Sequence, residues 1–80
     1  SDHCEIHSFR GFRTFESFKG QIISIFSLNL KANISTSGLK YNLKNDLLNS
    51  PSNGVSNVSM KEKFSIESTS SIFVIQNYKK

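Results

Sequence analysis

The sequence predicts a small, mostly antiparallel β domain built from two hairpins. Apolar and polar residues alternate with a period of two along residues 28–43 and again along residues 58–78, as in strands with one buried face. A short Ser-rich stretch interrupts each of these segments and suits the turn of a hairpin. We expect the two hairpins to form one twisted sheet, a minimal sandwich or a barrel.

Length and composition limit what such a domain can be. The 80 residues suit a single domain over residues 1–80, and a chain this short buries only about 60–65% of its unfolded surface. The formal net charge of +4 gives a mild preference for anionic partners. Cys4 is the only cysteine, so no disulfide can form within the chain. No stretch approaches the roughly 18 consecutive apolar residues of a membrane span. We therefore expect no membrane-spanning segment.

The N-terminal segment has no clear period. Residues 1–7 are polar and are expected to be frayed. Aromatic residues then recur at every third position, at Phe9, Phe12, Phe15 and Phe18. A spacing of three suits neither a helix nor a flat strand, so two interpretations stay open. The segment is either a short helix, which would make the domain α+β, or a twisted edge segment with a bulge at Gly11.

The first hairpin is predicted because apolar residues before and after its loop fall opposite one another in a single register. Ile34 is expected opposite Leu39, and the same register brings the remaining apolar residues together as core: Leu30 with Leu43 and Ala32 with Tyr41. The opposite face carries only Asn and Lys. A helix over residues 39–48 is the alternative, because leucines recur there at a spacing of four. The strand is favoured because it also explains Tyr41.

The second hairpin follows a stretch of turn residues. Residues 49–54 are rich in Asn, Ser, Pro and Gly and predict a loop between the hairpins. Ile66 is expected opposite Ile72, with residues 68–71 as the turn. Residues 72–75 are apolar on both faces, which favours an interior strand.

Two local patterns suggest binding chemistry. His3, Glu5 and His7 would share one face of a strand and are weak candidates for zinc ligands, but an unligated N-terminus is the commoner outcome and we predict no metal site. Aromatic and basic side chains could also contact nucleic acid, since rings stack on bases and cations contact phosphates. The candidate residues are Phe9, Arg10, Phe12, Arg13, Lys31, Lys40 and Lys44. The competing interpretation is that the Phe rings cover the core and the lysines solvate the sheet.

Catalytic patterns are missing from the sequence. It contains no Gly-rich phosphate loop and no nucleophile elbow, and its carboxylates are scattered. We therefore predict a non-enzymatic protein-binding module without a cofactor, such as an assembly subunit or a small inhibitor, whose partner is another protein chain. A nucleic-acid-binding module is the alternative. The abundance of Asn, Lys, Ile, Phe and Ser suggests an AT-rich genome, including those of viruses and phages.

Overall fold

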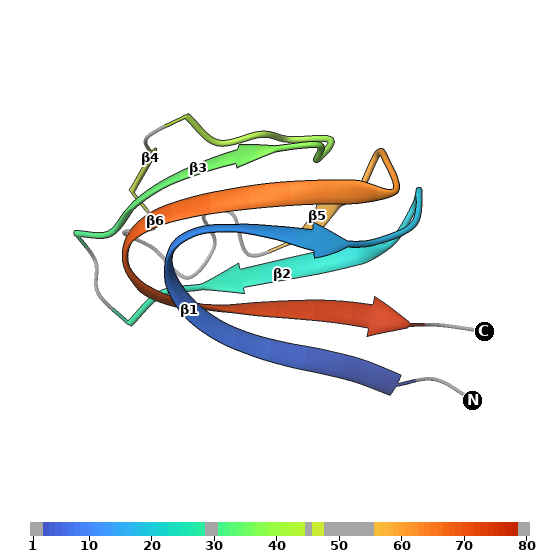
Figure 1. Ribbon diagram of the computed structural model, residues 1–80, viewed down its shortest axis with the longest axis horizontal. Coiled ribbons are helices and arrows are strands. Elements are labelled where there is room, and N and C mark those ends of the chain that lie inside the picture. The colour runs from blue at the N-terminus through green and yellow to red at the C-terminus, as the bar shows by residue number, and fades with distance from the viewer. Residues whose placement is uncertain (1–2, 29–30, 45, 48–55, 79–80) are drawn as a thin grey trace.

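The computed structural model describes residues 3–28, 31–44, 46–47 and 56–78 (Figure 1). These residues form six strands of one antiparallel sheet: β1 (His3–Glu16), β2 (Ile22–Phe26), β3 (Asn33–Ser37), β4 (Asp46–Leu47), β5 (Asn57–Val58) and β6 (Lys63–Tyr78). The predicted mostly β, antiparallel class is confirmed. The described part of the chain contains no helix, so the N-terminal segment is a strand, and nothing in that part could cross a membrane as a helix.

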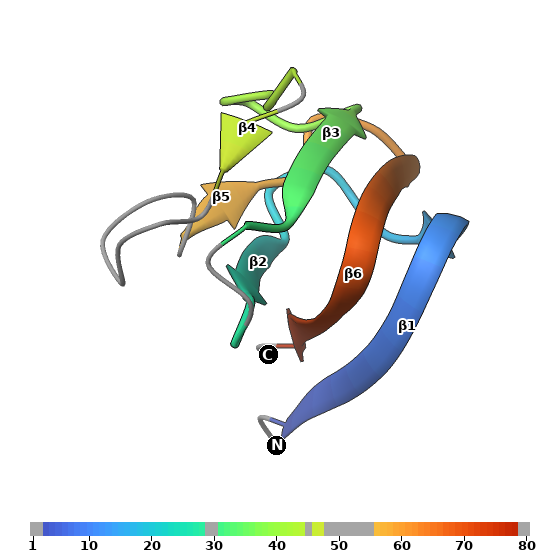
Figure 2. The ribbon, with the colours of Figure 1, turned by 90° about the vertical axis from the view of Figure 1, so that its left-hand side faces the viewer.

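The long strand β6 organises the sheet. It pairs with β1 along its whole length, from Glu16 opposite Lys63 to His3 opposite Tyr78. On its other edge, β3 pairs with residues 65–68 and β2 pairs with residues 73–76. The ribbon of β1 and β6 bends in its middle, so that its two halves face each other across the core (Figures 1 and 2).

The bend lies at an irregularity in the pairing of β1 with β6. Phe9 pairs with Ile72 and Gly11 with Ser68, so that Arg10 alone stands opposite residues 69–71 of β6. Of the two interpretations left open for this segment, the edge strand with a bulge at Gly11 is the nearer one: the register shift lies between Phe9 and Gly11, but the extra residues belong to β6. Between these two pairs β6 has more residues than β1, and this difference in length forces the ribbon to curve.

The predicted second hairpin is wrong. Ile66 and Ile72 do not pair with each other; Ile66 pairs with Arg13 and Thr36, and Ile72 pairs with Phe9. Residues 68–71 lie inside the continuous strand β6, where Ser68 Oγ donates to the Ser70 carbonyl at 2.7 Å. Because β1 supplies a partner for the whole of β6, the Ser-rich stretch bends without reversing the chain.

The predicted register of the first hairpin is also wrong. Ile34 pairs with Ser68 of β6 and with Asp46 of β4, not with Leu39. After β3 the chain crosses to residues 57–60: Leu39 forms an isolated bridge with Ser59, and the Met60 amide donates to the Gly38 carbonyl at 2.9 Å. This crossing links the β3 side of the sheet to the β5 side and closes the structure around the core.

Alternation nevertheless identified most of the buried side chains. The core consists of Phe15, Ile23, Ile25, Ile34, Leu39, Phe64, Ile66, Ile72 and Val74. Tyr41 and Leu28 are clear exceptions, because both have the parity expected of the core and are 62% and 87% exposed. Leu30 and the loop predicted at residues 49–54 lie outside the described residues.

The N-terminal Phe residues, three of them in β1 and Phe18 beyond its end, divide by parity. Phe15 is buried and stacks on Phe64 with 4.9 Å between ring centroids, and Phe9 packs partly buried against the core. Phe12 and Phe18 are exposed. Residues 3–7, which were expected to be frayed, lie in β1 and pair with residues 74–78 of β6, because β6 extends far enough to satisfy their backbone groups.

Candidate functional site

A short loop after β3 combines a fixed backbone with exposed side chains. We call residues 38–43 the Tyr41 loop. It begins at Gly38, whose φ of +89° suits glycine and lets the chain leave β3 toward residues 57–60. Leu39 is buried, and Leu43 packs partly buried against the core. Both apolar ends of the loop are therefore anchored.

Asn57 holds the middle of the Tyr41 loop. Its side chain is 2% exposed, and its Oδ1 accepts hydrogen bonds from the amides of Tyr41 at 3.0 Å and Val58 at 2.9 Å. Its Nδ2 donates to the Tyr41 carbonyl at 2.7 Å. One buried amide thus binds both backbone groups of Tyr41, which fixes the position from which the ring projects.

The side chains of Asn42 and Thr36 form hydrogen bonds with each other and with backbone amides of the loop. Asn42 Oδ1 accepts from the Leu39 amide and from Thr36 Oγ1, both at 3.0 Å. The same Thr36 Oγ1 accepts from the Leu43 amide at 2.9 Å, and the Thr36 amide donates to the Leu43 carbonyl at 2.9 Å. This dense bonding immobilises the loop, so a ligand that binds there needs to order little backbone.

The exposed groups of the Tyr41 loop are an aromatic ring and an ammonium. The Tyr41 residue is 62% exposed, and Lys40 Nζ lies 5.4 Å from the centroid of its ring. A ring presented on a rigid loop can stack on a planar ligand or attract a cation to its face. Rigidly held loops with exposed aromatic side chains are typical of binding sites.

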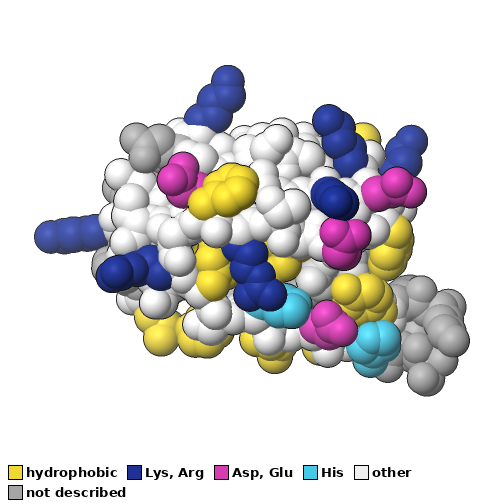
Figure 3. Space-filling view, in the orientation of Figure 1, with side chains coloured by type: hydrophobic (Ala, Val, Ile, Leu, Met, Phe, Trp, Pro, Cys, Tyr) yellow, Lys and Arg dark blue, Asp and Glu magenta, His cyan; other side chains and the backbone are white. Residues whose placement is uncertain are grey.

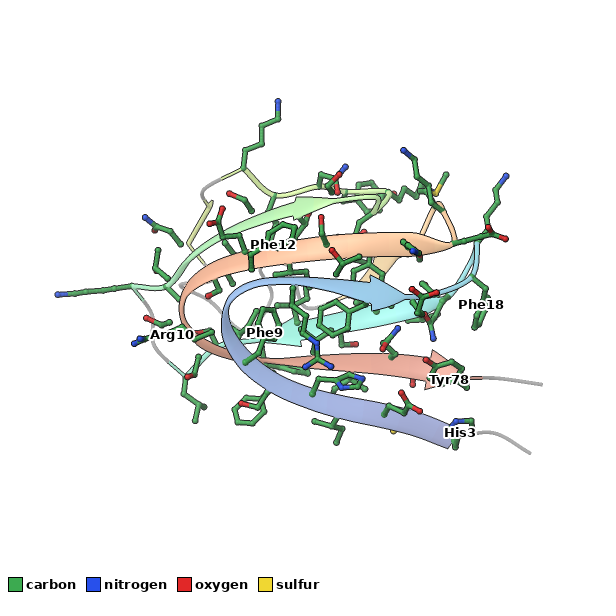
Figure 4. The ribbon with its side chains drawn as sticks, in the orientation of Figure 1. His3, Phe9, Arg10, Phe12, Phe18 and Tyr78 are labelled. Carbon is green, nitrogen blue, oxygen red and sulfur yellow. The ribbon has the colours of Figure 1, made fainter. Side chains whose placement is uncertain are left out.

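A second aromatic cluster lies where β1 begins and β6 ends (Figure 4). The rings of His3 and Tyr78 stack at 4.8 Å with an interplanar angle of 7°, and Phe18 lies 6.1 Å from Tyr78. His3 and Tyr78 are cross-strand partners, so their stacking helps to hold the two strand ends together. This cluster therefore has a structural role of its own.

The basic and aromatic residues predicted to contact nucleic acid do not form one surface. Arg13 lies over the rings of Phe15 and Phe9, with its Cζ 4.9 Å and 6.0 Å from their centroids, while Arg10 lies at the bend of β1 and Phe12 is exposed (Figure 4). The predicted lysines, Lys31, Lys40 and Lys44, flank β3. Because β6 separates β1 from β3, the arginines and lysines lie on opposite sides of it. Of this set, only Lys40 belongs to the Tyr41 loop.

The candidate zinc ligands have other partners. His3 stacks on Tyr78, and His7 Nε2 lies 3.5 Å from Glu5 Oε1 and 3.1 Å from Gln76 Oε1. In the part of the chain that the structure describes, no group of three His, Cys, Asp or Glu side chains is placed to hold a metal ion. Gln76 Nε2 already donates to the Glu16 carbonyl and to Gln21 Oε1, so Gln76 Oε1 must accept and His7 Nε2 must carry the proton.

Sequence reasoning missed Tyr41 and Asn57 as site residues. Tyr41 alternates with Leu39 and Leu43, so the sequence pattern places all three on one face. The ring is exposed because the chain leaves the strand direction at Gly38 and crosses to residues 57–60. Asn57 is 16 residues away from Tyr41 in the chain, and nothing in its local sequence marks it as a partner. A buried Asn that binds a distant backbone is visible only in three dimensions.

The fold and the Tyr41 loop together define a small β domain that presents an exposed aromatic side chain on a hydrogen-bonded loop. The family model of the thiamin pyrophosphokinase substrate-binding domain matches residues 7–75, a range that includes both Tyr41 and Asn57. The chain belongs to this family. A search of curated proteins finds no match.

A solved structure has the same fold. The crystal structure of thiamine pyrophosphokinase from Bacillus subtilis superposes with a TM-score of 0.76 and 19% sequence identity. The match covers 96% of this chain and 39% of that chain, so the sequence spans about two-fifths of the length of that enzyme.

These findings correct the functional predictions. A non-enzymatic protein-binding module of viral or phage origin, and the nucleic-acid-binding alternative, are both wrong, because the chain belongs to the substrate-binding domain family of an enzyme. The missing catalytic motifs led to this error. A domain that binds substrate can contribute to an enzyme through placement of the substrate, without a catalytic motif of its own.

Proposed function

We propose that this chain serves as the substrate-binding domain of a thiamin pyrophosphokinase and that its Tyr41 loop contacts thiamin. The supporting observation is that the Asn57 side chain hydrogen-bonds to both the amide and the carbonyl of Tyr41, while Tyr41 stays 62% exposed. Such an arrangement stabilises the position of an aromatic ring without burying it.

The chemistry of thiamin suits an exposed aromatic ring. Thiamin consists of a planar pyrimidine joined to a thiazolium ring that carries a permanent positive charge. The Tyr41 ring already attracts the Lys40 ammonium at 5.4 Å, and the same property would attract a thiazolium cation. Either ring of thiamin could also stack on it, with a contribution of about 0.5–2 kcal/mol.

The role assigned to this domain is the placement of thiamin. Transfer of a phosphoryl or pyrophosphoryl group depends mainly on the alignment of the attacking oxygen and on stabilisation of charge. A rigid loop meets the first requirement, because it holds the acceptor in one orientation. We assign the stabilisation of phosphate charge to groups other than those of the Tyr41 loop.

A titration with thiamin tests the proposal. We expect Tyr41→Ala to weaken binding of thiamin to this chain by about tenfold, which corresponds to about 1.4 kcal/mol. Tyr41→Phe keeps the ring and should retain most of the affinity. The measurement is a chemical-shift titration of the labelled chain by NMR, which reports weak binding.

Phe12→Ala provides the matched control. Phe12 is 68% exposed and belongs to β1, on the far side of β6 from β3. Its removal should leave thiamin affinity unchanged. Equal affinities of the wild-type chain and Tyr41→Ala, or an equal loss in Phe12→Ala, would contradict the proposal.

A further inference from the structure

The guanidinium of Arg13 is seated on two aromatic rings of its own strand. Its Cζ lies 4.9 Å from the centroid of the Phe15 ring and 6.0 Å from that of the Phe9 ring. The Phe64 ring stacks on Phe15 with an interplanar angle of 12°, so Phe64 covers one face of Phe15 and the guanidinium covers the other. Arg13 therefore caps an aromatic stack that continues into the core.

Strand pairing explains why this arginine lies against core rings. Arg13 is the cross-strand partner of Ile66, which is buried, so its side chain starts on the inner face of β1. Among the described strands β1 pairs with β6 alone, and a long side chain on such an edge strand reaches solvent. Figure 3 shows this side of the molecule, where Lys or Arg side chains lie beside hydrophobic and His side chains.

The N–H groups of Arg13 have no partner within the described part of the chain. The residue is exposed, and no hydrogen bond or ion pair joins it to another described residue. Two carboxylates of β1 lie against other groups: Glu5 Oε1 is 3.5 Å from His7 Nε2, and Glu16 Oε2 is 3.6 Å from Lys63 Nζ. The five donors of the planar guanidinium thus remain open to solvent.

We propose that Arg13 is the centre of a binding site for a small oxyanion, either a phosphate group or a carboxylate. The guanidinium binds two oxygens of the anion through parallel N–H···O hydrogen bonds, a geometry that suits both groups. Phe9 and Phe15 hold the guanidinium in one orientation, so less side-chain freedom is lost when the anion binds. The net charge of +4 also favours the approach of an anion.

The oxyanion site is separate from the Tyr41 loop. Strand β6 lies between β1, which carries Arg13, and β3, which the loop follows. The cation of the loop, Lys40, lies over the Tyr41 ring instead. The oxyanion site therefore does not rest on thiamin binding, and Tyr41→Ala should leave its affinity for anions unchanged.

A titration of the labelled chain with inorganic phosphate tests the proposal. Phosphate replaces chloride at constant ionic strength, and NMR follows the Arg13 Nε–H signal and the backbone amides of β1. We expect a saturable shift with a dissociation constant on the order of 1–10 mM, as for one charge-assisted bidentate contact. A parallel titration with acetate distinguishes the two sources of the oxyanion, because the tighter of the two ligands identifies the preferred group.

Replacement of Arg13 separates the shape of the guanidinium from its charge. Arg13→Lys keeps the charge but loses the planar set of donors, so we expect it to weaken phosphate binding at least about fivefold. Arg13→Gln should weaken it at least about tenfold. Arg10→Gln is the matched control, since Arg10 is also exposed on β1 but is not seated over any described ring. It removes the same charge and should change the affinity less than about twofold.

The absence of a saturable shift up to about 50 mM phosphate would overturn the proposal. So would an Arg13→Lys variant that binds as tightly as the wild-type chain, or an equal loss of affinity in Arg10→Gln. Circular dichroism shows whether each variant folds, and Arg13→Lys decides the matter if Arg13→Gln unfolds.

Discussion

Gly38 shows how one residue can determine the course of the chain. Its φ of +89° lies in the left-handed region, and a Cβ at this position would lie 2.8 Å from the Lys63 carbonyl oxygen and 3.1 Å from Phe64 Cα. Both atoms belong to the backbone of β6 and cannot move aside cheaply. The crossing from β3 to residues 57–60 therefore requires glycine for its conformation and for its close packing.

We expect Gly38→Ala to lower the free energy of unfolding by about 3 kcal/mol, because it adds a steric clash to the cost of a positive φ. Gly20→Ala is the matched control. Gly20 has a φ of +94° with nothing within 4 Å of the added Cβ, so it should cost only about 1 kcal/mol. Urea unfolding followed by circular dichroism measures both, and equal losses would show that the close approach has no effect.

Asn57 acts as a positioning residue for Tyr41. Removal of its side chain leaves the Tyr41 amide and carbonyl without their partner, so we expect Asn57→Ala to lower stability by about 1–3 kcal/mol and also to weaken thiamin binding. The specific readout is hydrogen exchange at the Tyr41 amide, which should become faster than that of the core strands. If this amide stays as protected as the core in the variant, Asn57 does not position Tyr41.

At the scale of elements, a polar network ties the two ends of the β1–β6 ribbon to the segment between β1 and β2. Gln76 of β6, 2% exposed, donates to the Glu16 carbonyl at 2.8 Å and to Gln21 Oε1 at 3.1 Å, and accepts from His7. Ser17 Oγ also donates to Gln21 Oε1, at 2.6 Å. Among the described residues, no buried side-chain polar atom lacks a partner. Such a satisfied network specifies one register of the strands.

We expect Gln76→Ala to lower the free energy of unfolding by about 2–3 kcal/mol, since it creates a cavity and leaves Gln21 and the Glu16 carbonyl short of a partner. Asn77→Ala offers a comparison one residue away, because the hydrogen bond from Asn77 Nδ2 to the Ile22 carbonyl is longer, at 3.3 Å, and exposed. That variant should cost less than about 1 kcal/mol. Thermal or urea unfolding of both variants tests the difference.

The elements also show which sequence arguments succeed. A period of two placed Ile34, Leu39, Phe64 and Ile66 in the core, and all four are buried. The same pattern failed for pairing, because β6 binds β1, β2 and β3 and leaves no place for the predicted hairpins. Alternation states which side chains share a face, but any strand of suitable length can satisfy the backbone hydrogen bonds.

At the scale of the whole molecule, the proposed thiamin contact lies on one side of the sheet. The Tyr41 loop follows β3 and is held by Asn57 of β5, whereas β1 lies on the far side of β6 from β3.

The sequence by itself determined the mostly β class, the positive charge and most of the core, because these depend on composition and on a local period of two. It named Lys40 as a candidate contact but placed its neighbour Tyr41 in the core. Only the tertiary structure decided that Gly38 directs the chain toward residues 57–60 and that Asn57 binds both backbone groups of Tyr41. Each of these depends on contacts between residues distant in the chain, which a local pattern does not encode.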